Sequence, residues 1–169
     1  MVGLRPLLMP SRIEDPEQPV GFSDEFRVTV PGGGASVDAT DGVIHLTLSL
    51  RNAGSGLAVL DGWWVNISQK HCKEHAPLTS FTKHGRDLYV APGEHGFWQG
   101  ALRDPDAAIY SEVREAIREQ KHFTVELLYG DLEGGQRTIS RFSFLPPMEG
   151  IGWSCAVSRH WHLDAPDPR

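Results

Sequence analysis

The sequence predicts an all-β protein, an antiparallel and immunoglobulin-like β-sandwich of about eight strands with one inserted amphipathic helix. Three observations support this fold class. Short alternating segments recur about every 8–12 residues, Gly and Pro clusters separate them, and one segment alone has helical periodicity. A parallel sheet would need several crossover helices, so a single helix argues against it.

The N-terminal part of the chain supplies most of the predicted strands. The clearest is 43–52, where four apolar residues fall on one face and His45, Thr47, Ser49 and Arg51 on the other. Residues 10–25 are rich in Pro, Glu, Asp and Ser and should form a flexible surface loop, and 68–85 a polar loop. The strands expected here cover residues 5–9, 26–30, 43–52, 57–67, 88–91 and 95–102.

One helix is expected over about 104–120. Asp104 suits its N-cap and Pro105 its first position. The apolar stripe of this helix consists of Ile109, Val113, Ala116 and Ile117. Strands follow at 123–129, 137–145 and 152–163, of which the first two form a hairpin through the turn at 130–135. The last strand should place Trp153, Cys155, Val157 and Trp161 on one face, and 164–169 should be flexible.

Composition limits the kind of protein this is. The 169 residues fit one domain, 1–169, and the net charge of −6 argues against non-specific nucleic-acid binding. The sequence shows neither an apolar run long enough to cross a bilayer nor a signal peptide, which predicts a soluble, cytoplasmic protein. Membrane association is the alternative if a helix precedes the chain. Cys72 and Cys155 either form one disulfide or remain two free thiols.

Histidine and cysteine spacing suggests a zinc site. His71, Cys72 and His75 lie close together, with His84 behind them, while His160 and His162 share a strand face in a His-x-His pair. On a regular strand Cys155 faces the opposite way from that pair, so all three could share a metal only across a β-bulge. The alternative, which we prefer, is that these histidines face solvent and that no cofactor is bound.

Tryptophans supply a second candidate site. Trp63 and Trp64 are adjacent on a strand and must point to opposite faces. One of Trp63, Trp64 and Trp98, if exposed beside polar groups, could stack on a sugar ring or a peptide side chain. Trp153 and Trp161 are expected in the core.

Three short segments carry a resemblance. Leu50 to Ala58 reads Leu-Arg-Asn-Ala-Gly-Ser-Gly-Leu-Ala, residues 5–8 read Arg-Pro-Leu-Leu, and Tyr129 to Gly134 precedes an Arg-Thr pair at 137–138. Together they resemble uncharacterised bacterial immunoglobulin-like β-sandwich modules. The resemblance implies the fold and, for many such modules, a membrane tether. It implies no catalytic residues.

No catalytic motif is visible, since the sequence has no Gly-x-Ser-x-Gly, P-loop or dinucleotide-binding pattern. The sequence therefore predicts a non-enzymatic interaction module that binds a protein or a surface. The alternatives are a module that binds a glycan or a metal ion and, third, a hydrolytic enzyme. The oligomeric state is left open.

Overall fold

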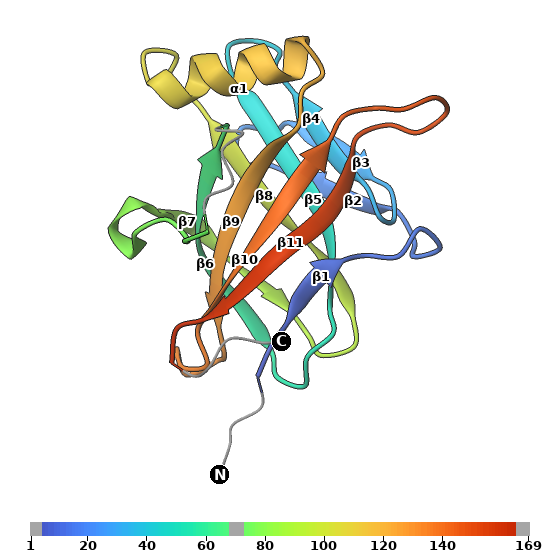
Figure 1. Ribbon diagram of the computed structural model, residues 1–169. Coiled ribbons are helices and arrows are strands. Elements are labelled where there is room, and N and C mark those ends of the chain that lie inside the picture. Colours follow the sequence, from blue (N-terminus) through green and yellow to red (C-terminus); the bar gives the residue numbers. More distant parts are fainter. Residues whose placement is uncertain (1–4, 68–72, 165–169) are drawn as a thin grey trace.

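The computed structural model describes residues 5–67 and 73–164, which form eleven β-strands, one α-helix and one short 3-10 helix (Figure 1). The helix is α1 (Ala108–Arg118) and the 3-10 helix is η1 (Leu78–Ser80). The strands are β1 (Leu8–Pro10), β2 (Gln18–Gly21), β3 (Arg27–Val30), β4 (Ala35–Asp38), β5 (Ile44–Asn52), β6 (Ala58–Asn66), β7 (Thr82–Val90), β8 (His95–Leu102), β9 (Phe123–Gly130), β10 (Thr138–Leu145) and β11 (Ser154–His162).

Two antiparallel sheets pack face to face, which confirms the all-β sandwich with one helix. In sheet I, β5 is central, β8 pairs along one edge, and β4 and β1 pair in succession along the other. Sheet II has the order β11-β10-β9-β6-β7. The sheets are joined on one side, where Gly34 bridges Ser154 and the Ala35 amide donates to the Trp153 carbonyl. On the other side β7 and β8 face each other as edge strands.

The inner faces of the sheets enclose the main core. Leu46 and Leu48 of β5 meet Phe142 and Phe144 of β10, all four fully buried. Helix α1 closes one end of this core (Figure 1) with Tyr110, Val113 and Ala116. The predicted apolar stripe is therefore confirmed in part, with Ile109 and Ile117 packed at its margin.

The predicted start of the helix is wrong. The N-cap is Ala107, and helical residues run from 108 to 118 instead of from 104 to 120. Asp104 instead accepts a hydrogen bond from the Asp106 amide through its side chain and one from the Ala107 amide through its carbonyl. An aspartate that bonds its own following backbone makes a turn, so Asp104 forms a turn that leads into the helix.

A hairpin of β2 and β3 covers the outer face of sheet I, which the sequence did not predict. The Gln18 amide donates to Ser49 and to the Gly96 carbonyl, and Gln99 donates to the Gly21 carbonyl. His45, Thr47 and Ser49 are consequently buried, although they lie on the polar face of β5. The surface loop expected at 10–25 is wrong in part, because residues 18–21 of it form β2.

A bulge in β11 corrects the predicted face of the last strand. The register with β10 shifts between Arg141 and Phe142, which leaves Ser158 as an extra residue. Cys155 and Val157 face the main core, whereas Trp161 beyond the bulge packs with Leu128 and Ile139 on the outer face of sheet II. Trp161 is thus buried as expected, but not beside Cys155.

The Leu-Arg-Asn-Ala-Gly-Ser-Gly segment is a structural junction. Buried Asn52 accepts hydrogen bonds from the Leu7 and Gly54 amides, and its amide group donates to the Gly56 and Val90 carbonyls. A Cβ at Gly54 would lie 2.3 Å from the Arg5 carbonyl oxygen, so only glycine fits there. The motif that carries the resemblance therefore binds the N-terminal segment to the β5–β6 turn.

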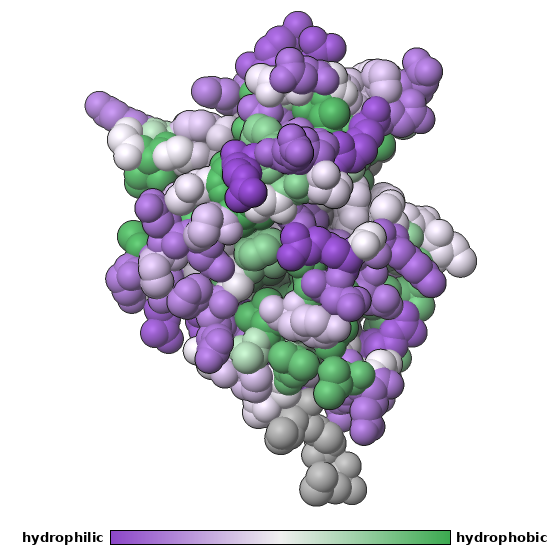
Figure 2. All heavy atoms as spheres, turned by 180° about the vertical axis from the view of Figure 1, so that it is seen from behind, coloured by the Kyte–Doolittle hydropathy of each residue, from purple (hydrophilic) through white to green (hydrophobic). Residues whose placement is uncertain are grey.

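Hydrophilic residues dominate the face shown in Figure 2, and the hydrophobic ones visible there form small separate groups. Within the described part of the chain, α1 is the sole α-helix, and it is too short and too polar to cross a bilayer.

Candidate functional site

The structure does not bring the predicted zinc ligands together. His71 and Cys72 lie outside the described residues. His75 lies against Trp161 on the outer face of sheet II, with ring centroids 5.5 Å apart, and His160 lies on the inner side of β11. Among residues 5–67 and 73–164, no three His, Cys, Asp or Glu side chains are placed to hold a metal ion. The β11 bulge turns His160 and His162 to the side of Cys155, but these three described side chains are not placed together to hold a metal ion.

His160 belongs to an internal hydrogen-bond chain. The Leu8 amide donates to the Tyr129 hydroxyl, which lies 2.7 Å from the Ser140 hydroxyl, and Ser140 lies 2.6 Å from His160 Nδ1. A neutral His160 either accepts from the Ser140 hydroxyl at Nδ1 or donates to it, according to its tautomer. Burial, followed by the nearby His162, lowers the pKa of His160, which fits the neutral form. Ser140 is fully buried, so this Ser–His pair presents no nucleophile to an outside substrate.

The segment around His75 is fastened to sheet II. Glu126, fully buried, accepts from the Ala76 amide and from the guanidinium of Arg141. Arg141 also donates to the Glu74 carbonyl and lies over the Trp161 ring, 4.9 Å from its centroid. His75 is therefore part of a structural contact between this segment and the sheet.

Cys155 is a free, buried thiol, and burial raises its pKa. The alternative of a pair with Cys72 falls partly outside the described residues. In a Cys72→Ser variant, we expect the remaining thiol to react with Ellman's reagent at least about 100-fold more slowly in the native state than in urea. Equal rates in the two states would contradict this placement of Cys155.

The candidate tryptophans occupy three environments. Trp98 is fully buried in the core, so it lines no binding surface. Trp63 faces Trp98 in a T-shaped contact at 5.6 Å, and Trp64 is half-buried on the opposite side of β6. The predicted opposition of Trp63 and Trp64 is confirmed, and both border one hollow.

That hollow belongs to a cleft along the open side of the sandwich, where β7 and β8 face each other. We call it the seam cleft. A narrow part of about 300 Å³ lies between β7 and β8, and a wide part of about 430 Å³ lies beside α1. The two parts share Trp63 and Thr82. The narrow part is otherwise lined by Phe22, Ser23, Lys83, His84, Gly85, Arg86, Gln99, Gly100, Ala101 and Arg103, and the wide part by Trp64, Val65, Asn66, Ser80, Leu102, Ala108, Ile109 and Glu112.

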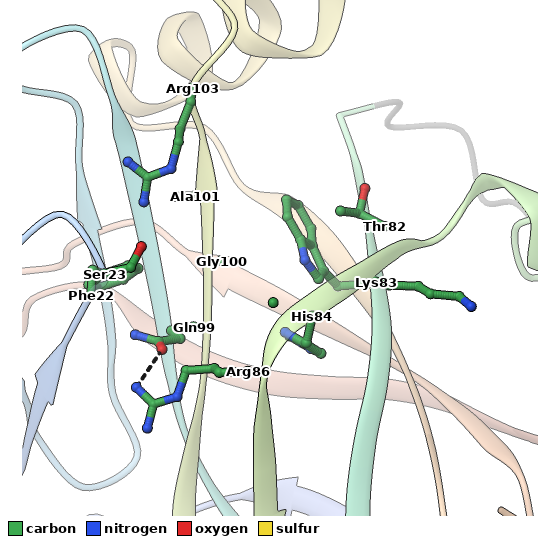
Figure 3. A pocket seen from close by; sticks show the side chains of 12 residues that line it. Phe22, Ser23, Thr82, Lys83, His84, Arg86, Gln99, Gly100, Ala101 and Arg103 are labelled. Carbon is green, nitrogen blue, oxygen red and sulfur yellow. Dashed lines mark hydrogen bonds between the residues drawn. The ribbon is translucent and has the colours of Figure 1, made fainter.

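Polar side chains converge on the narrow part (Figure 3). Arg86 donates to Gln99 Oε1 at 3.1 Å, and Gln99 in turn donates to the Gly21 carbonyl at 2.9 Å. Arg103 enters from the α1 side and lies toward Ser23, whereas the Lys83 amine points away. The β2–β3 layer thus fixes one wall of the cleft, and β7 supplies the other.

Asp24 holds Arg103 in place. Its carboxylate lies 2.6 Å from Arg103 Nη1 and 2.8 Å from His45 Nε2. The Arg103 guanidinium, with His45 second, keeps the pKa of Asp24 well below its usual range. The His45 ring stacks on Phe26 at 4.0 Å, which anchors the cluster to β3.

His84 has an unusual environment. Its Nε2 atom is buried without a hydrogen-bond partner, and its side chain lines the narrow part of the cleft (Figure 3). Burial lowers the pKa of His84 to about 4, and the nearby Asp61 carboxylate offsets this only in part. His84 is therefore neutral at neutral pH, and the cleft contains an unsatisfied polar atom that a ligand could bond.

The lowered pKa of His84 predicts a pH dependence. Between its folded pKa of about 4 and an unfolded value of 6.5, the unfolded chain binds the extra proton. Protonation of His84 therefore does not lower the free energy of unfolding above pH 6.5. As the pH drops toward 4, the free energy of unfolding falls by about 2 kcal/mol, after allowance for solvent screening. NMR titration of the His84 ring should give the pKa, and His84→Asn should lose less stability in acid than the wild type. A pKa near 6.5 would contradict the burial.

Sequence reasoning named His84 as a ligand behind the first histidine group, but it did not find Arg86, Gln99 or Arg103. A signal was present: residues 82–86 read Thr-Lys-His-Gly-Arg in a chain with 22 acidic and 16 basic residues. Nothing in the sequence, however, indicates that this run and β8 line the same cleft.

Comparisons with known proteins add little about function. A scan against protein-family models finds no match, and a search of curated proteins finds no relative. Among solved structures, the chain is similar to a protein from Archaeoglobus fulgidus, at 11% identity, with 78% of this chain and 94% of that chain covered and a TM-score of 0.30. The fold and the seam cleft therefore carry the functional argument by themselves.

Proposed function

We propose that the protein is a non-enzymatic binding module that takes an extended segment of a partner protein into the seam cleft. The observation that carries this proposal is the pair of facing edge strands. β7 is the last strand of sheet II and β8 pairs with β5 on its other side, while a cleft separates part of their facing edges. Unpaired strand edges bind extended chains through backbone hydrogen bonds.

The shape of the cleft supports a segment rather than a compact ligand. The narrow and wide parts meet at Trp63 and Thr82, so a chain lying along β7 would pass from one to the other. In the wide part, half-buried Trp64 and Ile109 offer apolar surface for a side chain of the partner. Aromatic anchors of this kind contribute strongly to binding at protein interfaces.

Selection of peptides from a display library tests the proposal. We expect enriched peptides whose affinity falls at least about tenfold in Trp64→Ala, since that variant removes the aromatic anchor. Leu132→Ala is the matched control, because Leu132 is 72% exposed and lies outside the cleft. A library that yields no binder, or binders indifferent to Trp64→Ala, would overturn the proposal.

A sugar is the second candidate ligand, favoured by the exposed part of Trp64 in the wide hollow. Titration of tryptophan fluorescence with a sugar panel tests it, and no quenching by any sugar would count against it. We also propose a cytoplasmic location. The three motifs described above support a further proposal, kinship with bacterial immunoglobulin-like modules. No observation on the described residues favours zinc or hydrolysis over these.

A further inference from the structure

We propose that the narrow part of the seam cleft is a subsite for one carboxylate group, so that the segment bound there presents an aspartate or glutamate side chain. This inference rests on the proposed function and names the chemistry of its partner. The first observation is the charge of the lining side chains. The narrow part is lined by Lys83, Arg86 and Arg103 and by no carboxylate.

The basic lining sets the narrow part apart from the other hollows described along residues 5–67 and 73–164. The chain carries a net charge of −6, and the other described hollows all include acidic side chains. These are Glu112 beside α1, Asp15 and Glu94 near the β5–β6 turn, and Asp61 and Asp131 near the β9–β10 turn. A basic cleft on an acidic protein attracts anions locally while the rest of the surface repels them.

Hydrogen-bond donors in the narrow part are held in place and partly unused. The described hydrogen bonds of Arg86 and Arg103 both run through Nη1, to Gln99 and Asp24 respectively. Each guanidinium therefore retains Nη2 and Nε for a ligand, in the forked geometry that suits a carboxylate. Because Gln99 and Asp24 already orient these groups, little side-chain freedom is lost when a ligand binds.

His84 supplies a neutral contact in the same place. Its buried Nε2 lacks a partner in the free protein, and a buried polar atom without a hydrogen bond is unfavourable. In the tautomer that carries the proton on Nε2, it donates to a carboxylate oxygen. Ser23 lines the same hollow from the turn after β2.

The net charge of the subsite favours a carboxylate over a phosphate. Asp24 offsets much of the charge of Arg103, and Lys83 points away from the hollow. Arg86 is left as the principal uncompensated cation facing the site, since its described bonds go to the neutral oxygens of Gln99 and Gly21. About one unit of positive charge matches a singly charged carboxylate, whereas a dianionic phosphate would remain partly unpaired.

NMR titration at constant ionic strength tests the subsite directly. The probes are N-acetylglutamate N-methylamide, its glutamine analogue, and inorganic phosphate. We expect saturable shifts at Ser23, His84 and Gln99 with the glutamate probe and none with the glutamine analogue. Arg86→Gln should lower the affinity for the glutamate probe at least about tenfold. Arg114→Gln, which removes the same charge from the exposed face of α1, should leave that affinity unchanged.

Several results would overturn the subsite: equal shifts from both amino-acid probes, insensitivity to Arg86→Gln in a folded variant, or tighter binding of phosphate. These outcomes are distinct from failure of the proposed function. If display-selected peptides keep their affinity when Glu is replaced by Gln, yet lose it in Trp64→Ala, the binding module stands and the carboxylate subsite falls. If the glutamate probe binds but no peptide does, the carboxylate subsite stands and the binding module falls.

Discussion

Replacing Asn52 with alanine should lower the free energy of unfolding by about 3–5 kcal/mol, because two buried and two partly buried backbone groups would lose their partner, at about 1–3 kcal/mol for each buried group. The Asn52 side chain is 1% exposed and bonds the Leu7 and Gly54 amides and the Gly56 and Val90 carbonyls. The two bonds that its amide group donates are buried, and the two that its side-chain oxygen accepts are partly buried. Urea unfolding measured by tryptophan fluorescence gives the change.

Two further variants separate the hydrogen bonds from the side-chain volume at this junction. Asn52→Asp keeps the volume and an acceptor but places a second oxygen against two carbonyls, so it should be at least as destabilising as alanine. Ser111→Ala, on the exposed side of α1, should change stability by no more than about 0.5 kcal/mol. A loss below about 1 kcal/mol for Asn52→Ala would show that the junction relaxes.

Glu126→Ala should destabilise the protein by a similar amount, about 3–5 kcal/mol, since breaking a buried ion pair leaves a charge without its partner. Glu126 is fully buried, and its Oε2 accepts from Arg141 at 2.9 and 3.1 Å. Its Oε1 accepts from the Ala76 amide at 2.8 Å, so the variant should also free the segment around residue 76. Chemical denaturation measures the first effect, and hydrogen exchange of the Ala76 amide measures the second.

A double-mutant cycle with Arg141→Ala isolates the pair. If the two groups act together, the double variant should lose at least about 1.5 kcal/mol less than the sum of the single losses. Additive losses, or unchanged exchange at Ala76, would contradict the assigned role of Glu126. The result matters for function, because this segment leads through η1 to Ser80 and Thr82 in the wall of the seam cleft.

Local periodicity predicted the sheets better than it predicted their surroundings. The alternation in β5 identifies the strand, and parity correctly separates Trp63 from Trp64. The same alternation does not show that His45, Thr47 and Ser49 are buried. The hairpin that covers them pairs the predicted strand at 26–30 with β2, whose Gln-Pro-Val-Gly sequence has weak strand propensity. Amphipathicity reports polarity, whereas burial depends on what packs against the face.

The seam cleft lay beyond sequence reasoning for a related reason. His84 and Arg86 lie on β7, Gln99 on β8, and Arg103 just after β8, but one wall of the cleft comes from residues 22 and 23, which are distant in the sequence. The one-residue bulge at Ser158 likewise has no visible signal, yet it moves Trp161 from the inner face to the outer one. Such features depend on contacts between distant segments, which a periodic pattern does not encode.

The ion pair between Arg5 and Asp164, 2.7 Å apart, joins the two ends of the described chain. Both ends lie at the pole of the sandwich opposite α1 (Figure 1), whereas the wide part of the cleft includes residues of α1. A dye or an immobilising linker placed beside Arg5 or Asp164 would therefore leave from the same pole. The wide part of the cleft, beside α1, would then point away from the support.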